Sequence, residues 1–250
     1  MVSTPEHILT LTDVVSGYGK MTVLNGTTAA IRRGAITTVI GPNGAGKSTM
    51  FKTVFGLLPV RTGSIRFDGR ETIGFSPRQM IDAGVCYVPQ GRNIFPELSV
   101  LHNLELGGVA LADQSRLSDR IDAMLQRFPM LREKLRAQAS TLSGGQQKLL
   151  EVARGLLLDP KLMLIDEPSI GLSPILVREI FDILKGLRDK GVTILLIEQN
   201  AKQALQVSDY GLVLEQGQTR IEGEARTILA DQRIAQLFLG GGLQQVEAVK

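Results

Sequence analysis

The chain has 250 residues, 43% hydrophobic and 21% charged, a composition typical of one large globular domain or of a domain with a smaller lobe. A net charge of +3 without a long Lys/Arg block is too mild to indicate nucleic acid, and 4% aromatic residues with no Trp argue weakly against a surface that stacks on bases. The single cysteine, Cys86, lies in the apolar stretch GVCYV, which excludes a disulfide framework or a cysteine cluster and predicts a buried thiol. We also expect no secretory leader, because MVSTPEHILTL lacks a leader's basic and apolar segments, and therefore a reducing compartment. No apolar run reaches about 18 residues, so we expect no membrane-spanning helix.

The first part of the chain predicts a strand, a helix and then a mainly helical segment. The apolar run 35–40 predicts a buried strand, and after a glycine-rich turn a helix is expected to begin near Gly46. Residues 98–158 have helical periodicity and no convincing strand, and Pro129 is expected to end one of these helices. The apolar face of that helix is formed by Leu117, Ile121, Met124, Leu125 and Phe128. We therefore expect a helical lobe inserted between the strands of a sheet.

The later part predicts a strand–helix–strand unit and a hairpin. Buried strands are predicted over 162–165 and 192–197, and the helix between them is expected to begin at the Ser-Pro pair 173–174 and to stop at Gly191. Its apolar face contains Ile180, Ile183, Leu184 and Leu187. This order of elements predicts a parallel sheet. Residues 210–223 predict a hairpin that turns at Gln216-Gly217, and we expect the end of the chain, 238–250, to be frayed.

The turn after the first predicted strand reads GPNGAGKS, residues 41–48, and fits the phosphate-loop pattern G-x-x-x-x-G-K-[ST] between a strand and a helix. Glycines let backbone N–H groups surround phosphate oxygens, and the start of the helix favours anions. A lysine here reaches the β- and γ-phosphates, and the following serine hydroxyl can ligate Mg²⁺. The predicted nucleotide-binding residues are Gly41, Pro42, Asn43, Gly44, Ala45, Gly46, Lys47, Ser48 and Thr49, with Ser48 also a metal ligand.

Two adjacent carboxylates, Asp166 and Glu167, follow the predicted strand 162–165. In a parallel α/β sheet, ligands bind beyond the carboxyl ends of the strands, so we expect this pair near the phosphate loop. Asp166 would hold Mg²⁺ through water, and Glu167 would polarise the attacking water. Without the phosphate loop, a solvated strand end would be the simpler interpretation.

A third motif, LSGGQQK at 142–148, precedes a predicted helix that Ser143 is expected to cap. Alone it indicates an ordinary capped helix, but beside the phosphate loop and the acid pair it is specific. With all three motifs, the chain resembles the ATP-binding cassette of ABC transporters over about residues 8–240. The resemblance implies an α/β P-loop NTPase cassette with a mostly parallel core sheet, an N-terminal antiparallel β part and an inserted helical lobe. It also implies one domain with its core over about 8–95 and 159–225, its lobe over about 96–158 and a tail over about 226–250.

The same resemblance implies roles for individual residues, with ATP and Mg²⁺ as cofactors. Gln90, in YVPQGR, would reach Mg²⁺ and the water and join the sheet to the lobe. Tyr18 would stack on adenine, although a plain strand-end tyrosine is the alternative. The lobe and the segment RNIFPELSVLHNL would contact membrane subunits, although it can also be an ordinary surface loop. In such cassettes the LSGGQ stretch binds the γ-phosphate of ATP held by a second subunit, so the residues that act in trans would be Ser143, Gly144, Gly145 and Gln146.

Several stretches resemble one branch of the family, the shorter of two ATPase subunits in importers of branched-chain amino acids. They are YGK at 18–20, QGRNIFPELSVLHNLELGG at 90–108, RFPML at 127–131, DEPSIGLSP at 166–174 and IEQNAKQAL at 197–205. The branch implies as partners two membrane permeases, a second ATPase subunit (a homodimer being possible in isolation) and a solute-binding protein, but no nucleic acid. It also implies a peripheral position at the cytoplasmic face of the plasma (inner) membrane. Importers of urea, short amides or aromatic acids share such cassettes and stay open as alternatives.

Two further classes are weighed against a transport motor. A nucleic-acid or ribosome ATPase usually has two cassettes, coiled-coil insertions or zinc cysteines, none of which this sequence contains. A non-catalytic scaffold predicts a lost lysine or acid, yet Lys47, Asp166 and Glu167 are all present.

The chain departs from the general cassette pattern at two positions. Ser173 stands where many cassettes have Asp, and Gln199 stands where most have a γ-phosphate-sensing His. An amide can donate an N–H to phosphate but carries no charge. We therefore expect Glu167 to activate the water and Gln199 to position it, and we interpret Glu198 as the less informative polar residue of ILLIEQN.

Overall fold

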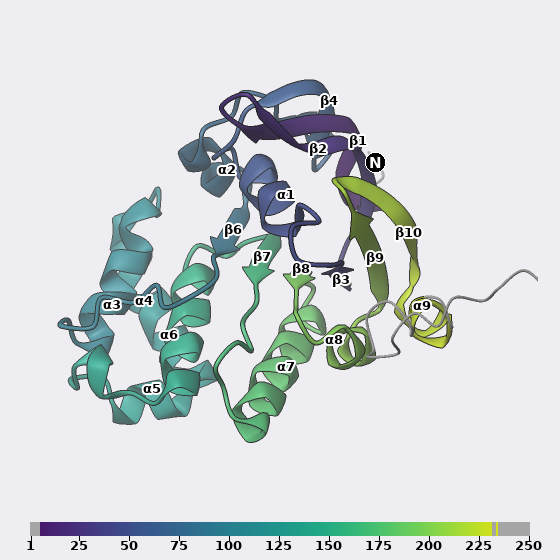
Figure 1. The fold of residues 1–250 in the computed structure, drawn as a ribbon. Helices are drawn as coiled ribbons and strands as arrows, with labels where there is room; N and C mark the ends of the chain where they lie inside the picture. The colour runs from purple at the N-terminus through teal and green to yellow at the C-terminus, as the bar shows by residue number, and fades with distance from the viewer. Residues whose placement is uncertain (1–5, 232–233, 235–250) are drawn as a thin grey trace, which may run out of the picture.

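The computed structural model describes residues 6–231 and residue 234, and its centre is a six-stranded sheet in the order β10-β9-β3-β8-β7-β6 (Figure 1). The neighbouring pairs from β9 to β6 are parallel, and only β10 runs antiparallel to its neighbour. The strands are β3 (Ile36–Ile40), β6 (Val85–Val88), β7 (Leu162–Asp166), β8 (Thr193–Ile197), β9 (Tyr210–Glu215) and β10 (Gln218–Glu224). The predicted α/β class and the mostly parallel sheet are confirmed.

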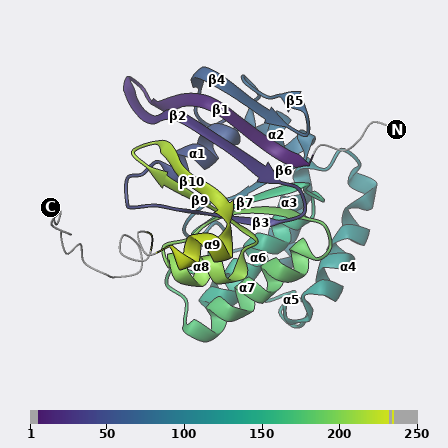
Figure 2. The ribbon, with the colours of Figure 1, turned by 90° about the vertical axis from the view of Figure 1, so that its right-hand side faces the viewer.

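A second, antiparallel sheet covers one face of the core sheet through a shared apolar layer (Figure 2). Its order is β2-β1-β4-β5, with β1 (His7–Tyr18), β2 (Met21–Arg32), β4 (Val60–Phe67) and β5 (Arg70–Glu71). Helix α1 (Lys47–Val54) lies in this layer, where the fully buried Met50 and Phe51 join the cluster that includes Leu164 and Leu195 of the core strands. Helix α2 (Pro77–Ala83), capped by Ser76, contributes Met80 to the same layer.

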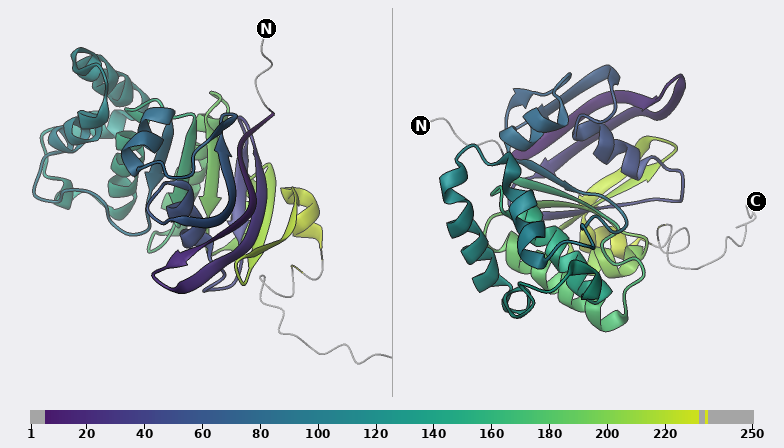
Figure 3. Two further views of the ribbon diagram at one scale, coloured as in Figure 1. Left: turned by 90° about the horizontal axis from the view of Figure 1, so that it is seen from above. Right: turned by 90° about the vertical axis from the view of Figure 1, so that its left-hand side faces the viewer.

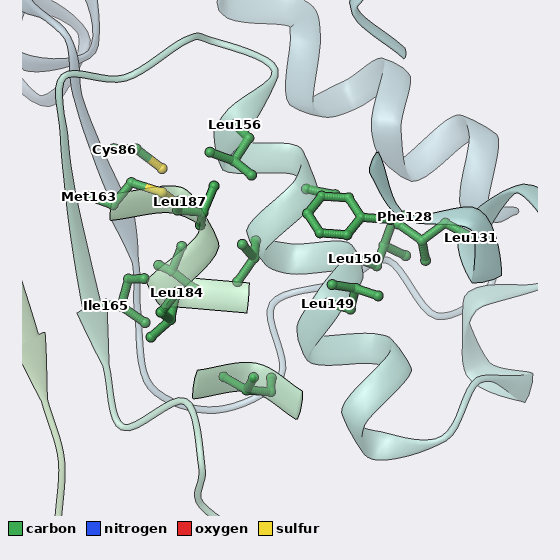
Figure 4. Close-up of a cluster of buried hydrophobic side chains, with 14 of the residues drawn as sticks. Cys86, Phe128, Leu131, Leu149, Leu150, Leu156, Met163, Ile165, Leu184 and Leu187 are labelled. Atoms are coloured by element: carbon green, nitrogen blue, oxygen red, sulfur yellow. The ribbon is translucent and has the colours of Figure 1, made fainter. Parts of the chain in front are cut away.

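The opposite face of the core sheet packs against α6 (Gly144–Leu156) and α7 (Pro174–Arg188). Alternating side chains of β7 point to opposite faces, as the pleat of a strand requires, so Met163 and Ile165 face these helices while Leu164 faces α1. Figure 4 shows the two β7 side chains beside leucines of α6 and α7. Helix α7 begins after its predicted cap Ser173, which accepts from the Leu176 N–H, but it ends at Arg188, before Gly191.

The segment between β6 and β7 forms the predicted helical lobe, to one side of both sheets (Figure 3). Besides α6 it contains α3 (Val100–Gly107), α4 (Leu117–Arg127), α5 (Pro129–Glu133) and short 3-10 turns at 108–110, 114–116 and 139–141. Pro129 ends α4 as predicted and also starts α5, where a missing N–H costs nothing. Within the described part of 98–158 there is no strand, only an isolated bridge between Ser99 and Gln138.

The end of the described chain forms the predicted hairpin and two short helices, α8 (Ala201–Val207) and α9 (Ala225–Ala230). Gln216 and Gly217 both have positive φ, 50° and 74°, as a two-residue hairpin turn requires. Residues 226–230 of the predicted tail are therefore helical, and buried Ile228 packs with α8. The segment 238–250, expected to be frayed, lies outside the described residues. The domain boundaries given above stay a prediction. None of the described helices has the length and hydropathy needed to cross a membrane.

Candidate functional site

A cleft of about 800 Å³ lies at the carboxyl ends of the core strands. Its lining combines the phosphate loop with side chains that are far away in the sequence. They come from the ends of β7 and β8, the segment after β6, the β9–β10 turn and the start of β2. The lining residues are Met21, Thr22, Val23, Asn25, residues 43–49, Gln90, Glu167, Ile170, Gln199 and Gln216.

The phosphate loop joins the fully buried strand β3 to α1, as the sequence predicts. At Gly41 a Cβ would lie 2.1 Å from the Leu214 carbonyl oxygen, so only glycine fits this close approach. Gly46 has φ 102°, a left-handed conformation that places the start of α1 behind the loop. Lys47 Nζ donates to the carbonyl oxygens of Gly41 (2.8 Å) and Pro42 (3.2 Å). Burial lowers the pKa of Lys47, and this effect is opposed by the nearby carboxylates of Glu167 and Asp166.

Asp166 is the last residue of β7 and is almost completely buried. Burial raises the pKa of its carboxyl group, against the effect of hydrogen bonds from Ser48 and Tyr87. The Tyr87 hydroxyl lies 3.5 Å from Oδ2, while Oδ1 is buried and has no hydrogen-bond partner. An unpaired buried carboxylate oxygen beside a serine hydroxyl fits a hard cation such as Mg²⁺.

Glu167 turns out of the strand with φ 47°, a strained value for a side chain with a Cβ, and faces the cleft. Its N–H donates to the Ile197 carbonyl oxygen (2.9 Å), and its Oε2 accepts from Gln90 Nε2 at 2.6 Å. Burial and then the negative charge of Asp166 raise the pKa of Glu167, while Lys47 and the Gln90 hydrogen bond oppose the shift. The structure therefore brings Gln90 and Glu167, 77 residues apart in the sequence, into direct contact.

At the tip of β8, Gln199 is exposed and lines the cleft, whereas Glu198 is only 2% exposed and points away from solvent. Glu198 accepts from the Ser169 N–H (3.0 Å), the Ser169 hydroxyl (2.7 Å) and the Gln199 N–H (3.2 Å). Our interpretation of Glu198 as the less informative residue did not anticipate this role: its carboxylate joins Ser169, in the loop after Glu167, to the backbone of Gln199. The signal in the sequence was an acid placed directly after the apolar run ILLI, residues 194–197.

Tyr18 is not among the lining residues of the cleft. It ends β1, is exposed, and its hydroxyl accepts from Lys52 Nζ at 3.4 Å. The neighbouring turn is held by Arg61, which sequence analysis missed and which donates to Thr22 Oγ1 (2.6 Å) and to the carbonyl oxygens of Gly19 and Met21 (both 3.0 Å). Stacking of Tyr18 on adenine stays a prediction.

The LSGGQ residues lie at the start of α6 and do not line this cleft either. Ser143 and Gln146 form a capping box, in which the Gln146 N–H donates to the Ser143 hydroxyl and the Ser143 N–H donates to Gln146 Oε1. Within one chain, Gly144 and Gly145 are therefore separate from the phosphate loop, and their predicted role in trans stays a prediction.

Residues 24–170 match the family model described as "ABC transporter". Over 234 residues the chain is 39% identical to the high-affinity branched-chain amino acid transport ATP-binding protein BraG of Pseudomonas aeruginosa, a match that covers 94% of this chain and 100% of that relative. It is 38% identical to the probable branched-chain amino acid transport ATP-binding protein LivF of Archaeoglobus fulgidus, covering 90% and 95% of the two chains. The lipopolysaccharide export system ATP-binding protein LptB of Escherichia coli is 32% identical, with 93% and 97% covered.

Among solved structures, the ADP conformation of MJ1267, an ATP-binding cassette of an ABC transporter, superposes with a TM-score of 0.85. The two are 28% identical, and the match covers 94% of this chain and all of the other. That the cleft with its phosphate loop and acid pair holds the nucleotide stays a prediction. The chain is an ABC ATPase and belongs to the ABC transporter family.

Proposed function

We propose that the chain hydrolyses ATP to drive an importer of branched-chain amino acids. The observation that carries the chemistry is the contact of Gln90 with Glu167, 2.6 Å long, in the cleft that Lys47 also lines. This contact supports the proposal, in which a water held by the carboxylate beside the phosphate loop would attack the γ-phosphate. The solute is proposed from the two relatives of highest identity quoted above, both named for branched-chain amino acid transport.

In this proposal, Glu167 takes the proton of the attacking water, and its raised pKa makes it a stronger base than an exposed carboxylate. Lys47 and the N–H groups of the phosphate loop hold the β- and γ-phosphates. Gln90 orients Glu167, and Gln199 donates its amide N–H on the γ-phosphate side. Each of these groups stabilises charge or fixes a position, which is how phosphoryl transfer is catalysed.

Ser48 and Asp166 would hold Mg²⁺, with Gln90 completing the site through its carbonyl oxygen or a water. When bound, the ion neutralises charge that develops on the β- and γ-phosphate oxygens. The part of the chain that the structure describes has no cluster of three His, Cys, Asp or Glu side chains suited to a metal. A site with few protein ligands is what Mg²⁺ uses when water and phosphate supply the rest.

Residues 143–146 would act on the ATP of a second cassette, a related chain in the importer or a second copy in isolation. The membrane permeases would contact a groove of about 370 Å³ between the core and the helical lobe. Tyr87 and Val88 line it from the core, and Leu106 and Val109 line it from the lobe. Because Val109 is 65% exposed, the rim of the groove offers apolar surface to a partner. This position at the cytoplasmic face of the plasma membrane requires no membrane-spanning helix in the chain itself.

The test is transport in sealed vesicles that contain the chain with two candidate permeases, a second cassette and a candidate solute-binding protein. We expect ATP inside the vesicles to drive uptake of leucine, isoleucine and valine, and Lys47→Ala to abolish it. Urea and acetamide serve as competing solutes in the same vesicles. Uptake of urea without leucine would replace the branched-chain proposal with the amide importer, and ATP hydrolysis with no uptake of either would overturn both.

A further inference from the structure

The segment that follows Gln90 is held by three side chains on one face of α6. They are Lys148, Glu151 and Arg154, and we call them the α6 clasp. Their spacing of three residues places them one above the other along the helix. Lys148 Nζ lies 2.5 Å from Glu151 Oε2, and the two side chains are only 7% and 3% exposed. Buried ion pairs are unusual, because the loss of hydration can exceed the attraction between the charges. The pair therefore requires an explanation other than stability.

The clasp binds the backbone of residues 91–93, which form no strand or helix. Lys148 Nζ donates to the Gly91 carbonyl oxygen at 2.9 Å, and the Asn93 N–H donates to Glu151 Oε1 at 2.6 Å. Arg154 Nη1 donates to the Asn93 carbonyl oxygen at 2.5 Å. Residues 91–93 are exposed, yet three of their backbone groups are held by charged side chains of a single helix, and hydrogen bonds to charged groups are stronger than those between neutral groups.

Gln90 lies between two anchors as a result. On one side β6 and Pro89 tie it to the core sheet, and on the other side Gly91, with φ 94°, is bound to Lys148. The amide of Gln90 then reaches Glu167 at 2.6 Å. The clasp therefore fixes the course of the backbone after Gln90, and with it the position from which the Gln90 side chain reaches Glu167.

We propose that Lys148 and Glu151 are positioning residues: by holding the backbone that follows Gln90 on α6, they keep the Gln90 amide against Glu167. Neither residue touches the nucleotide cleft. This inference rests on the proposed ATP hydrolysis.

The test replaces both charges at once, in Lys148→Met/Glu151→Leu, which keeps apolar volume and leaves no unpaired charge. A buried pair replaced in this way is often as stable or more stable, so we expect the urea midpoint to be unchanged or higher. We expect the ATP dissociation constant of the protein to stay within about twofold, because the phosphate loop is untouched, and kcat to fall about tenfold or more. The control is Asp182→Asn/Lys185→Gln, an exposed pair of the same spacing on α7 (71% and 40% exposed), which should keep wild-type kcat.

A second set of variants separates positioning from packing. If the clasp acts through Gln90, then Lys148→Met/Glu151→Leu should lower kcat in the wild type but have no further effect in a Gln90→Ala background. Wild-type kcat in the double variant, equal losses in both backgrounds, or a loss of kcat that follows a loss of stability would each overturn the inference. A wild-type chain that does not hydrolyse ATP would instead overturn the proposed function.

Discussion

The change Glu167→Gln tests the role of the carboxylate most directly, because it removes a proton acceptor and keeps the shape of the side chain. The backbone bond from the Glu167 N–H to Ile197 does not depend on the side chain, so the left-handed turn should persist. The Gln90 amide can still donate to an amide oxygen at the same place. What is lost there is the charge assistance of a hydrogen bond now 2.6 Å long, about 1 kcal/mol.

The expected effect on the reaction is much larger than this structural cost. A positioned general base contributes about 100- to 10,000-fold, which corresponds to about 3–5 kcal/mol of barrier. Lys47 and the phosphate loop are untouched, so ATP should still bind. We therefore expect a protein that binds ATP and favours a closed pair of cassettes but hardly turns over.

Turnover is measured as phosphate release at saturating ATP and Mg²⁺, and binding as retention of labelled ATP. Size-exclusion chromatography with and without ATP reports the paired state. Glu179→Gln, at an exposed position on α7, controls for the loss of one carboxylate and should keep wild-type turnover. Turnover within about threefold of the wild type in Glu167→Gln would refute the assignment, because a general base cannot contribute so little.

Three further predictions concern neighbouring residues. Gln199→His should leave ATP binding intact and change the rate of phosphate release, and wild-type turnover in Gln199→Ala would show that the positioning role is wrong. Asp166→Asn should raise the Mg²⁺ concentration needed for half-maximal ATP hydrolysis by about tenfold or more, with ATP binding measured in parallel; an unchanged requirement would exclude Asp166 as a ligand. Burial raises the pKa of Glu198 above its usual 4.5, against the hydrogen bonds from Ser169, so its contribution to stability is fully present below pH 4.5 and is lost as pH rises through the raised value. The stability of the wild type minus that of Glu198→Gln, from urea unfolding, should therefore fall as pH increases from 4.5. A difference that rises over this range would contradict the shift.

Much of the site could be predicted because its motifs are local. The phosphate loop depends on glycines and a lysine within eight residues, between a strand and a helix that the apolar pattern also indicates. The acid pair follows directly from the end of β7. In each case the residue types and the backbone conformation are specified by near neighbours, so no knowledge of strand order is needed.

The remaining features depend on strand order, which the sequence does not reveal. Strand β8 comes after β7 in the chain but lies between β3 and β7 in the sheet, and this order places Gln199 at the same cleft as Lys47 and Glu167. The contact of Glu198 with Ser169 has the same origin, since it joins the ends of two strands that are neighbours only in the folded sheet. Arg61 was missed because its three partners lie about 40 residues earlier, on a turn whose position depends on antiparallel pairing.

The electrostatics of the cleft explain why the acid pair is useful rather than only costly. Burial raises the pKa of Asp166 and Glu167 together, and the negative charge of Asp166 adds to the shift at Glu167, so both carboxylates lie in an environment that disfavours their charge. Lys47 offsets part of this charge but is itself partly desolvated. A nucleotide that enters with its own negative charge would increase the repulsion unless a divalent cation entered with it. Positive charge at Asp166 would then lower the cost of ionising both carboxylates, so the bound substrate itself would keep Glu167 in the form that can accept a proton.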